Sequence, residues 1–263
     1  MSPHCARTQP SSYLPRFCTM PASFPLRIGT AGWSLMLRDA PSFPSEGSHL
    51  QRYAQVFNAA EINSSFHRPH RRSTYERWAA SVPDDFHFAA KLPRLITHDL
   101  ALRGARKPFA TFLGEAGGLG RKLAALLVQL PPKLVFECRT AAAFFKMLRG
   151  EFPRDIVCEP RHVSWFGDGA EEAFAAHKVS RVAADPVRKG ATFIPGGTRD
   201  IAYFRLHGSP RMYYSSYTDE CLAALAAQLQ AAEAKRRWCI FDNTASGVAI
   251  GNALTLQRLL QDR

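Results

Sequence analysis

The sequence lacks the patterns that identify a membrane-spanning, secreted or zinc-binding protein. It has no apolar run long enough to cross a bilayer, and its first 25 residues lack the apolar stretch of a secretory signal. Six cysteines are present, but none has C-x-x-C spacing and no histidine pair completes a zinc pattern. Free thiols of this kind are typical of a reducing compartment, so we expect a cytoplasmic protein without a membrane partner.

Acidic residues are also scarce. There are 22 aspartates and glutamates against 34 lysines and arginines, which gives a formal net charge of +12. The basic residues cluster in four stretches, 67–73, 103–107, 120–122 and 234–238. This charge favours an anionic partner, nucleic acid included, unless the stretches are ordinary solvated faces. No helix-turn-helix, RNA-recognition or zinc signature is present, so the nucleic-acid hypothesis depends on charge alone.

The chain is predicted to form one domain after a short extension. Residues 1–25 are rich in proline and serine, and we predict that they are disordered. Met20, just before the first apolar segment, is an alternative start. Residues 26–263 contain no linker, and no repeat other than an alternation of strands and helices. The pattern does not indicate an oligomeric state.

Eight short apolar segments have the character of β-strands. They are residues 26–33, 59–66, 86–93, 126–132, 155–162, 180–186, 201–208 and 238–243. Helical spacing follows nearly all of them, at residues 49–57, 73–82, 108–114, 121–127, 141–149, 171–178, 219–237 and 249–260. Strands that alternate with helices predict parallel βαβ units.

Eight such units in one chain of this length predict an α/β fold, a single-domain (β/α)8 barrel of the TIM type. Residues 187–200 depart from the pattern, because they contain a proline and paired glycines but no helical period. The helix between the sixth and seventh strands is therefore predicted to be missing or degenerate. An open doubly wound sheet is the alternative, although no glycine fingerprint follows the first strand.

Polar residues stand at the carboxyl ends of these strands, on the same face as earlier apolar residues. Side chains two apart share a face of a strand. This parity selects Glu61, Asn63, Lys91, Gln129, Glu159, Arg161, Asp185, Arg205 and His207. If the strands form a barrel, these side chains meet in its mouth, the end where enzymes of this fold carry their active sites.

Carboxylates and imidazoles that converge in this way can transfer protons near neutral pH. We assign acid–base roles to Glu159 and His207, with Glu61 and Asp185 in support. Arg161, Arg205 and Lys91 would hold a negatively charged group of the substrate. The alternative is a structural ion-pair network in which the cations only neutralise the acids.

A divalent metal is a further alternative. His207, Glu159 and Asp185, with His98 or His162, come from separate strands and are suitable ligand types. The positive charges of Arg161, Arg205 and Lys91 argue against a cation at the same place. No organic cofactor motif is present.

Other polar and aromatic residues near the strand ends have less specific signals. Asn63 and Gln129 either orient a substrate or bond to loop backbone, and Trp165 either walls the cleft or packs at its rim. Ser64 and Ser65 are poor candidates for a nucleophile, because no G-x-S-x-G elbow surrounds them.

Seven motifs together resemble the YecE-like family, domain of unknown function 72. They are "IGTAGWS" (28–34), "EINSSFHR" (61–68), "FAAKLPRLITH" (88–98), "VQLPP" (128–132), "EPRHVSWF" (159–166), "RLHG" (205–208) and "FDNTASGVAIGNA" (241–253). The resemblance implies a TIM-barrel-like domain without an established reaction. It adds Thr97, His98, His162 and Asn243 to the cleft residues. His67 replaces a common tyrosine, Asp242 stands where Asn is frequent, and the segment after Trp33 is shorter than usual.

The function hypothesis is an enzyme that acts on a small anionic substrate at this acid–base cleft, with hydrolysis as the first choice of reaction. The alternative is a nucleic-acid-binding protein or nuclease that uses the basic surface. The sequence does not identify the substrate.

Overall fold

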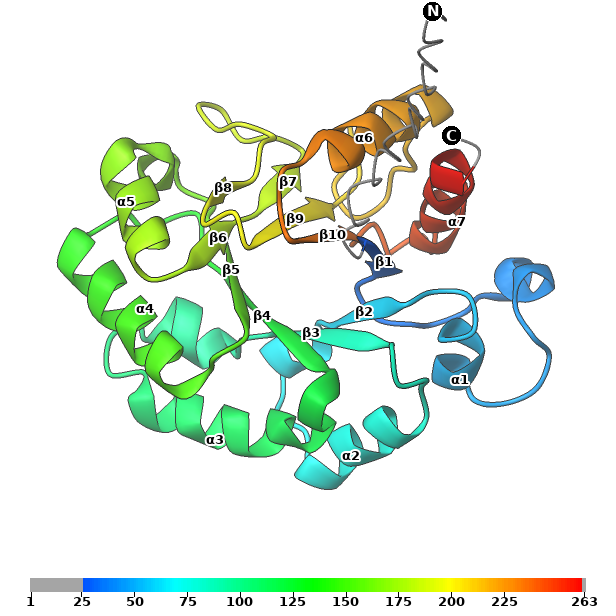
Figure 1. The fold of residues 1–263 in the computed structure, drawn as a ribbon, viewed down its shortest axis with the longest axis horizontal. Coiled ribbons are helices and arrows are strands. Elements are labelled where there is room, and N and C mark those ends of the chain that lie inside the picture. Colours follow the sequence, from blue (N-terminus) through cyan, green and yellow to red (C-terminus); the bar gives the residue numbers. More distant parts are fainter. Residues whose placement is uncertain (1–25, 262–263) are drawn as a thin grey trace, which may run out of the picture.

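The computed structural model describes residues 26–261, so the extension at residues 1–25 and the alternative start at Met20 lie outside the described residues. Strands and helices alternate along the described part of the chain, and the helices surround the strands (Figure 1). The strands are β1 (Leu26–Thr30), β2 (Ala59–Ile62), β3 (His87–Lys91), β4 (Leu123–Gln129), β5 (Asp155–Glu159), β6 (Val179–Arg181), β7 (Ala183–Asp185), β8 (Gly196–Gly197), β9 (Ile201–Leu206) and β10 (Arg236–Phe241).

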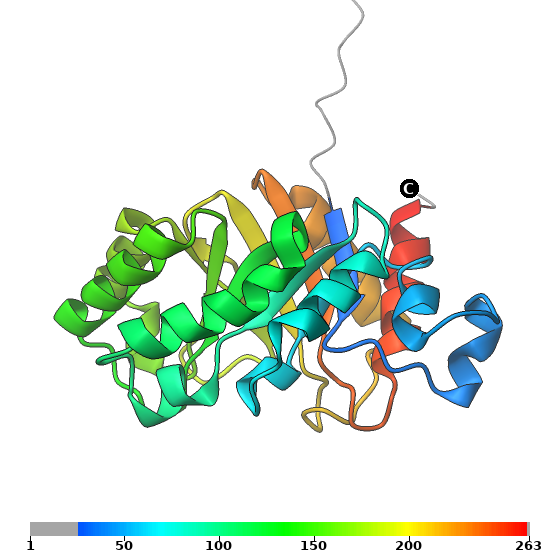
Figure 2. The ribbon, with the colours of Figure 1, turned by 90° about the horizontal axis from the view of Figure 1, so that it is seen from below.

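Seven α-helices and five short turns of helix connect the strands within residues 26–261. The α-helices are α1 (His49–Tyr53), α2 (Arg72–Ala80), α3 (Arg106–Ala116), α4 (Cys138–Glu151), α5 (Asp168–Ala176), α6 (Asp219–Ala231) and α7 (Ala249–Gln261). The short turns are η1 (Leu37–Ser42), η2 (Ser64–Phe66), η3 (Leu95–Asp99), η4 (Gly117–Lys122) and η5 (Val163–Phe166). Helices α2, α3 and α4 lie next to one another across strands β2 to β5 (Figure 2).

The strands form two sheets, in the orders β1-β10-β9-β7 and β2-β3-β4-β5-β6-β8. All pairings are parallel except that of the two-residue strand β8 with β6. The α/β class, the parallel pairing and the alternation with helices agree with the sequence prediction. Each of the eight predicted strand segments overlaps an observed strand, and the described chain has no helix between β7 and β9, as predicted.

The two sheets approach each other at two places. A parallel bridge joins Ala31, just after β1, to Glu61 in β2, and the amide of Gly32 donates to the carbonyl of Glu61 at 2.8 Å. Gly29 permits this approach, because a Cβ atom there would lie 2.0 Å from the carbonyl oxygen of Ala59. At the other edge, β6 pairs with β5, while β7, one residue later, pairs with β9.

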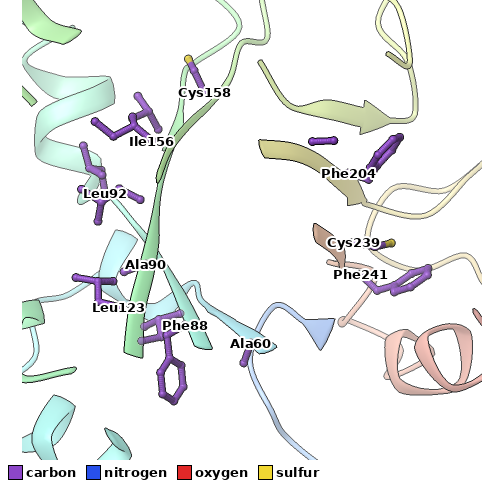
Figure 3. Close-up of a cluster of buried hydrophobic side chains, with 14 of the residues drawn as sticks. Ala60, Phe88, Ala90, Leu92, Leu123, Ile156, Cys158, Phe204, Cys239 and Phe241 are labelled. Carbon is purple, nitrogen blue, oxygen red and sulfur yellow. The ribbon is translucent and has the colours of Figure 1, made fainter. Parts of the chain in front are cut away.

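Alternate residues of the strands pack into two separate apolar clusters, one on each face of the strands. The outer cluster fills the space between strands and helices, and Figure 3 shows Phe88, Ile156, Phe204 and Phe241 pointing outward. The inner cluster is smaller. Its members are Ala59, Ala89, Ala125, Leu127, Val157, Val182, Ile201, Tyr203, Trp238 and Ile240.

Two of the helix predictions are wrong in part. Residues 121–127 were expected to be helical, but β4 begins at Leu123, after the turn at Gly120 with a φ of 55°. Ala125 and Leu127 face inward while Leu126 and Val128 face outward, so pairing with β3 and β5 overrides the helix propensity of alanine and leucine. The helix predicted over 219–237 ends at Ala231, because β10 begins at Arg236.

Candidate active site at the carboxyl ends of the strands

Charged side chains form one layer at the carboxyl ends of the strands, directly above the inner apolar cluster. Its members are Glu61, Lys91, Glu159, Arg205, His207 and Asp242. They come from β2, β3, β5 and β9 and from the residues that directly follow β9 and β10, and they continue the inward-facing parity of Ala59, Ala89, Val157, Tyr203 and Ile240. All six are at most 5% exposed. We call this set the charged layer.

Arg205 is the centre of the charged layer. Its guanidinium donates two hydrogen bonds to Glu61, from Nη2 to Oε1 at 2.6 Å and from Nε to Oε2 at 3.0 Å. Its Nη1 lies 2.9 Å from Glu159 Oε2, and its Nη2 lies 2.9 Å from Asp242 Oδ2. Burial alone would lower the pKa of Arg205, but the charges of these three carboxylates raise it further above its ordinary value. The guanidinium therefore has no nitrogen left for a substrate.

Glu159 and Asp242 are held in the ionised form. Burial alone would raise the pKa of Glu159, but the interactions with Arg161, His207 and Arg205 outweigh it and hold this pKa well below its usual range. Burial opposes ionisation of Asp242 in the same way, and Arg205 again lowers its pKa. Carboxyl groups with lowered pKa values are poor general acids at neutral pH.

His207 is fixed on both sides of its ring. Nδ1 lies 3.0 Å from Asp242 Oδ2, and Nε2 lies 3.1 Å from Glu159 Oε1 and 2.9 Å from Arg161 Nη2. The ionised Asp242 only accepts hydrogen bonds, so Nδ1 carries a proton. Nε2 then either donates to Glu159 or accepts from Arg161. Both ring nitrogens are therefore engaged by the protein.

Lys91 differs from the other members of the charged layer. Its side chain is nearly buried, yet its ammonium makes no hydrogen bond or ion pair within residues 26–261. The ammonium lies 4.0 Å from the centre of the Phe66 ring. Burial, and then the charge of Arg205, lower the pKa of Lys91 to about 8, against the opposing effect of the carboxylates.

Three predicted polar residues flank the charged layer, each with a polar group toward it. Asn63 Nδ2 lies 3.4 Å from Asp242 Oδ1, and Gln129 Nε2 donates to Glu159 Oε1 at 3.1 Å. Arg161 forms a close ion pair with Glu159. Asn63 Oδ1 and Arg161 Nε are buried and have no hydrogen-bond partner among the described residues.

A family model described as "Protein of unknown function DUF72" matches residues 27–263. The chain belongs to this family. The resemblance read from the sequence motifs is thereby confirmed.

The curated relatives include the UPF0759 protein YecE of Escherichia coli K12, which is 32% identical over 126 residues. That match covers 47% of this chain and 45% of the relative, so it spans about half the length of the curated protein. A crystal structure of a DUF72 family protein from Thermotoga maritima has a TM-score of 0.76 and 25% identity, with 90% of this chain and 99% of that chain covered. One from Enterococcus faecalis has the same TM-score at 21% identity, covers 90% and 95%, and supports the fold alone.

Three predicted site residues of this DUF72 protein lie away from the charged layer. Asp185 was expected to face inward, but Val182 and Ala184 pack with the inner cluster instead, and Asp185 accepts a hydrogen bond from Tyr217 at 2.7 Å. The parity chosen for this strand was therefore wrong by one residue. Asn243 faces outward and donates to Ser215 O and Asn252 Oδ1.

Trp165 is the third, and it is part of the core. Its ring packs against Phe145 of α4 and Phe174 of α5, and its Nε1 donates to the carbonyl of Leu134 at 2.8 Å. Only 1% of this side chain is exposed. The predicted cleft wall is thus a packed connection between helices, because the short turn η5 folds the aromatic side chain under α5.

Thr97, His98 and His162 lie near the strand ends but outside the ion-pair network. Thr97 Oγ1 and His98 Nδ1 are 2.9 Å apart, and the His98 ring packs edge-on against Phe66 at 5.0 Å. His162 instead caps the turn η5, where its Nδ1 accepts from the Ser164 amide.

Asp242 is the member of the charged layer that the sequence analysis did not select. It was noted only as a departure from a family pattern. The signal was available, because Trp238, Ile240 and Asp242 share one face of the last strand.

The metal hypothesis has no support from the arrangement of donors. Within residues 26–261, no group of three or more His, Cys, Asp or Glu is placed to hold a metal ion. The carboxylates that flank His207 are bound to guanidinium groups instead. Nor does any helix of the described chain have the length and apolar character needed to cross a membrane.

Proposed function

We propose that this chain is an enzyme that binds a small anionic substrate beside Lys91, at the mouth of a closed (β/α)8 barrel. Two features support closure: the bridge between Ala31 and Glu61, and the continuous segment from β6 to β7 that pairs with a different sheet at each end. Closure would enclose the inner apolar cluster and leave the charged layer at the carboxyl end, where barrel enzymes act.

The observation that carries the proposal is the nearly buried side chain of Lys91, whose ammonium makes no hydrogen bond or ion pair with the described residues. Burying a charged group without a compensating contact is costly, so such a group marks a functional position more often than a structural one. An anionic substrate would supply the missing partner. Arg161 and Asn63 support the same position, because each has one buried polar atom without a hydrogen bond.

Lys91 would also supply the chemistry. A pKa of about 8 leaves part of the population neutral at pH 7, so the amine can take a proton from a bound substrate and return it. Glu159 and Asp242 would act as positioning residues, because their pKa values are held low. We therefore favour proton transfer on a small carboxylate or phosphate ester over the paired-carboxylate chemistry of a glycosidase.

Calorimetric titration with sulfate and with acetate tests the binding step, because neither anion changes charge between pH 6 and 9. We expect Lys91→Met to weaken binding by about tenfold or more. Binding to the wild type should also weaken as the pH rises through 8, since the ammonium loses its proton. The control is Lys235→Met, which removes an exposed lysine paired to Asp200. Equal affinity in Lys91→Met and the wild type would reject the site.

Hydrogen–deuterium exchange at substrate carbon, followed by NMR over a panel of small keto acids and sugar phosphates, tests the catalytic step. With each compound at saturating concentration, exchange should increase with pH toward a plateau, with an apparent pKa above the value of about 8 in the free chain, because the bound anion stabilises the ammonium and the neutral amine is the base. Lys91→Met should abolish it. If anions bind at Lys91 but no compound in the panel exchanges, the chain is a binding protein.

Hydrolysis remains a second candidate, through Ser64, which the sequence analysis ranked low as a nucleophile. Ser64 Oγ lies 2.8 Å from His70 Nε2, the contact that activates a serine nucleophile. The rings of Tyr75 and Trp78 hold His70 edge-on, and burial, then the charge of Arg68, lower the pKa of His70, which favours the neutral base.

Cleavage of 4-nitrophenyl acetate tests this second candidate. Ser64→Ala and His70→Ala should both remove turnover and any acetyl adduct on the protein, whereas Ser81→Ala should retain them. Turnover that persists in Ser64→Ala would exclude the pair.

The nucleic-acid alternative depends on unpaired positive charge at the surface. Ion pairs leave less of that charge unpaired than the sequence suggested. Each basic stretch has at least one ion pair to an acid. These pairs include Arg72–Glu76, Arg106–Glu151, Arg121–Asp84 and Lys235–Asp200. Binding to generic DNA that falls steeply with salt would support the alternative.

A further inference from the structure

A pocket lies outside the charged layer, between the turns η2 and η3 and the helices α2 and α3. Its volume is about 520 Å³, within the range of small-molecule sites. Phe66, Tyr75 and Phe112 form buried walls, and Leu95, which is 48% exposed, lies at its opening. The ammonium of Lys91 lies over the ring of Phe66, so the pocket and the charged layer adjoin at this side chain.

The hydroxyl of Tyr75 is an uncommitted hydrogen-bond donor in the wall of this pocket. The Tyr75 side chain is fully buried, and its hydroxyl lies beside the Ser65 side chain without forming a hydrogen bond of good geometry among the described residues. Ser65, also in the wall, donates instead to the carbonyl of Ile62 or Lys91. Burial, and then the charge of Glu115, raise the pKa of Tyr75, so the group keeps its proton. A ligand acceptor would satisfy this donor, as buried polar groups require.

The charges at the pocket favour an anion over a cation. Arg68, Arg94 and Lys107 line it, against the carboxyl groups of Asp99 and Glu115. Asp99 is already paired with Arg94 at 3.3 Å, which leaves Arg68 and Lys107 against the single carboxyl group of Glu115. Arg68 and Lys107 make no ion pair within the described part of the chain and are available to a ligand.

We propose that this pocket binds an aromatic small molecule that carries one anionic group. The aromatic body would lie against Phe66 and Phe112, an acceptor on it would receive the hydrogen of Tyr75, and the anionic group would meet Arg68 and Lys107. The proposal does not depend on the role given to Lys91, because Lys91 does not line the pocket, although the Phe66 side chain is common to both sites.

Fluorescence titration with 8-anilinonaphthalene-1-sulfonate, an aromatic anion, tests the proposal against N-phenyl-1-naphthylamine, an uncharged analogue. We expect saturable binding of one sulfonate per chain. Thr111→Trp, which places an indole at the pocket from the exposed face of α3, should weaken it by about tenfold or more. Ala110→Trp, at the exposed neighbouring position that does not line the pocket, should change it by less than about twofold.

Two further variants separate the charge from the hydroxyl. Arg68→Gln with Lys107→Gln should weaken binding of the sulfonate about fivefold or more and leave the uncharged analogue unaffected. Tyr75→Phe should change binding of the sulfonate by less than about twofold, because this probe has no acceptor apart from the sulfonate that meets Arg68 and Lys107. Equal effects of Thr111→Trp and Ala110→Trp would overturn the proposed location. Equal effects of the charge variants on both probes would overturn the proposed anion.

Discussion

Arg205 and Lys91 are two cations in the same buried layer, and the protein treats them in opposite ways. Arg205 contacts three carboxylates, and its pKa is raised. Lys91 contacts an aromatic ring alone within the described residues, and its pKa is lowered to about 8. The same burial therefore produces a permanent structural charge at one position and a titratable group at the other.

The contrast separates a framework from a candidate reactive group. Replacing a buried ion pair with apolar residues is often neutral, whereas removing one partner is strongly destabilising. The ion-pair network around Arg205 therefore fixes where Glu61, Glu159 and Asp242 lie. Local conflicts such as the unpartnered ammonium of Lys91 are expected where function requires them.

Arg205→Met is expected to have the largest effect on stability, and it tests the contrast between Arg205 and Lys91 most directly. This change leaves three carboxylates in the core without their common cation, so we expect a loss of about 3–5 kcal/mol in the free energy of unfolding. Urea denaturation at pH 7, followed by circular dichroism, measures it.

Arg199→Met is the matched control for that measurement. Arg199 pairs with Glu233 at 3.3 Å, but the two side chains are 83% and 85% exposed. We expect a change of less than about 1 kcal/mol, because water screens such a pair. A similar loss of unfolding free energy in both variants would mean that the buried ion-pair network has no special role in stability.

Asp242→Asn should have an intermediate effect that depends on pH. The change weakens contacts with Arg205 and His207, and we expect a loss of about 2 kcal/mol at pH 7. The folded pKa of Asp242 is lowered, so its charge stabilises the fold above the unfolded pKa of about 3.9, and this stabilisation is lost as the pH falls through the folded value. The difference between the two proteins should therefore shrink below about pH 4. A difference that stays constant between pH 7 and pH 3 would contradict this account.

The sequence allowed the strands and most of the charged layer to be predicted, because both follow from alternation. Glu61, Lys91, Glu159 and Arg205 continue the inward face of their strands, and the structure brings them together. The prediction for Asp185 was wrong because its segment offers two alternating sets of residues as the inward face. The small apolar residues Val182 and Ala184 face inward, and Asp185 belongs to the other set.

The partners within the charged layer could not be predicted. Arg205 and Glu61 are 144 residues apart, and their contact depends on how the two sheets approach each other. Both cations looked alike in the sequence, and each was expected to hold an anion. Only the distances among side chains from separate strands show that Arg205 is paired with carboxylates at every nitrogen and that the Lys91 ammonium is not paired with one.

Among the three changes in the charged layer, Lys91→Met should have the smallest effect and the opposite sign. The folded pKa is about 8 against about 10.4 in the unfolded chain, so between these values the unfolded state binds more protons and the contribution of Lys91 to stability rises with pH. Below pH 8 the full cost of the buried charge is present. Because the flexible stem lets the ammonium recover part of its hydration, we expect Lys91→Met to be more stable at pH 7 by only about 1 kcal/mol. This advantage should vanish toward about pH 10.5. Denaturation of both proteins at pH 7 and pH 10 measures it, and a destabilised variant at pH 7 would show that Lys91 belongs to the framework with Arg205.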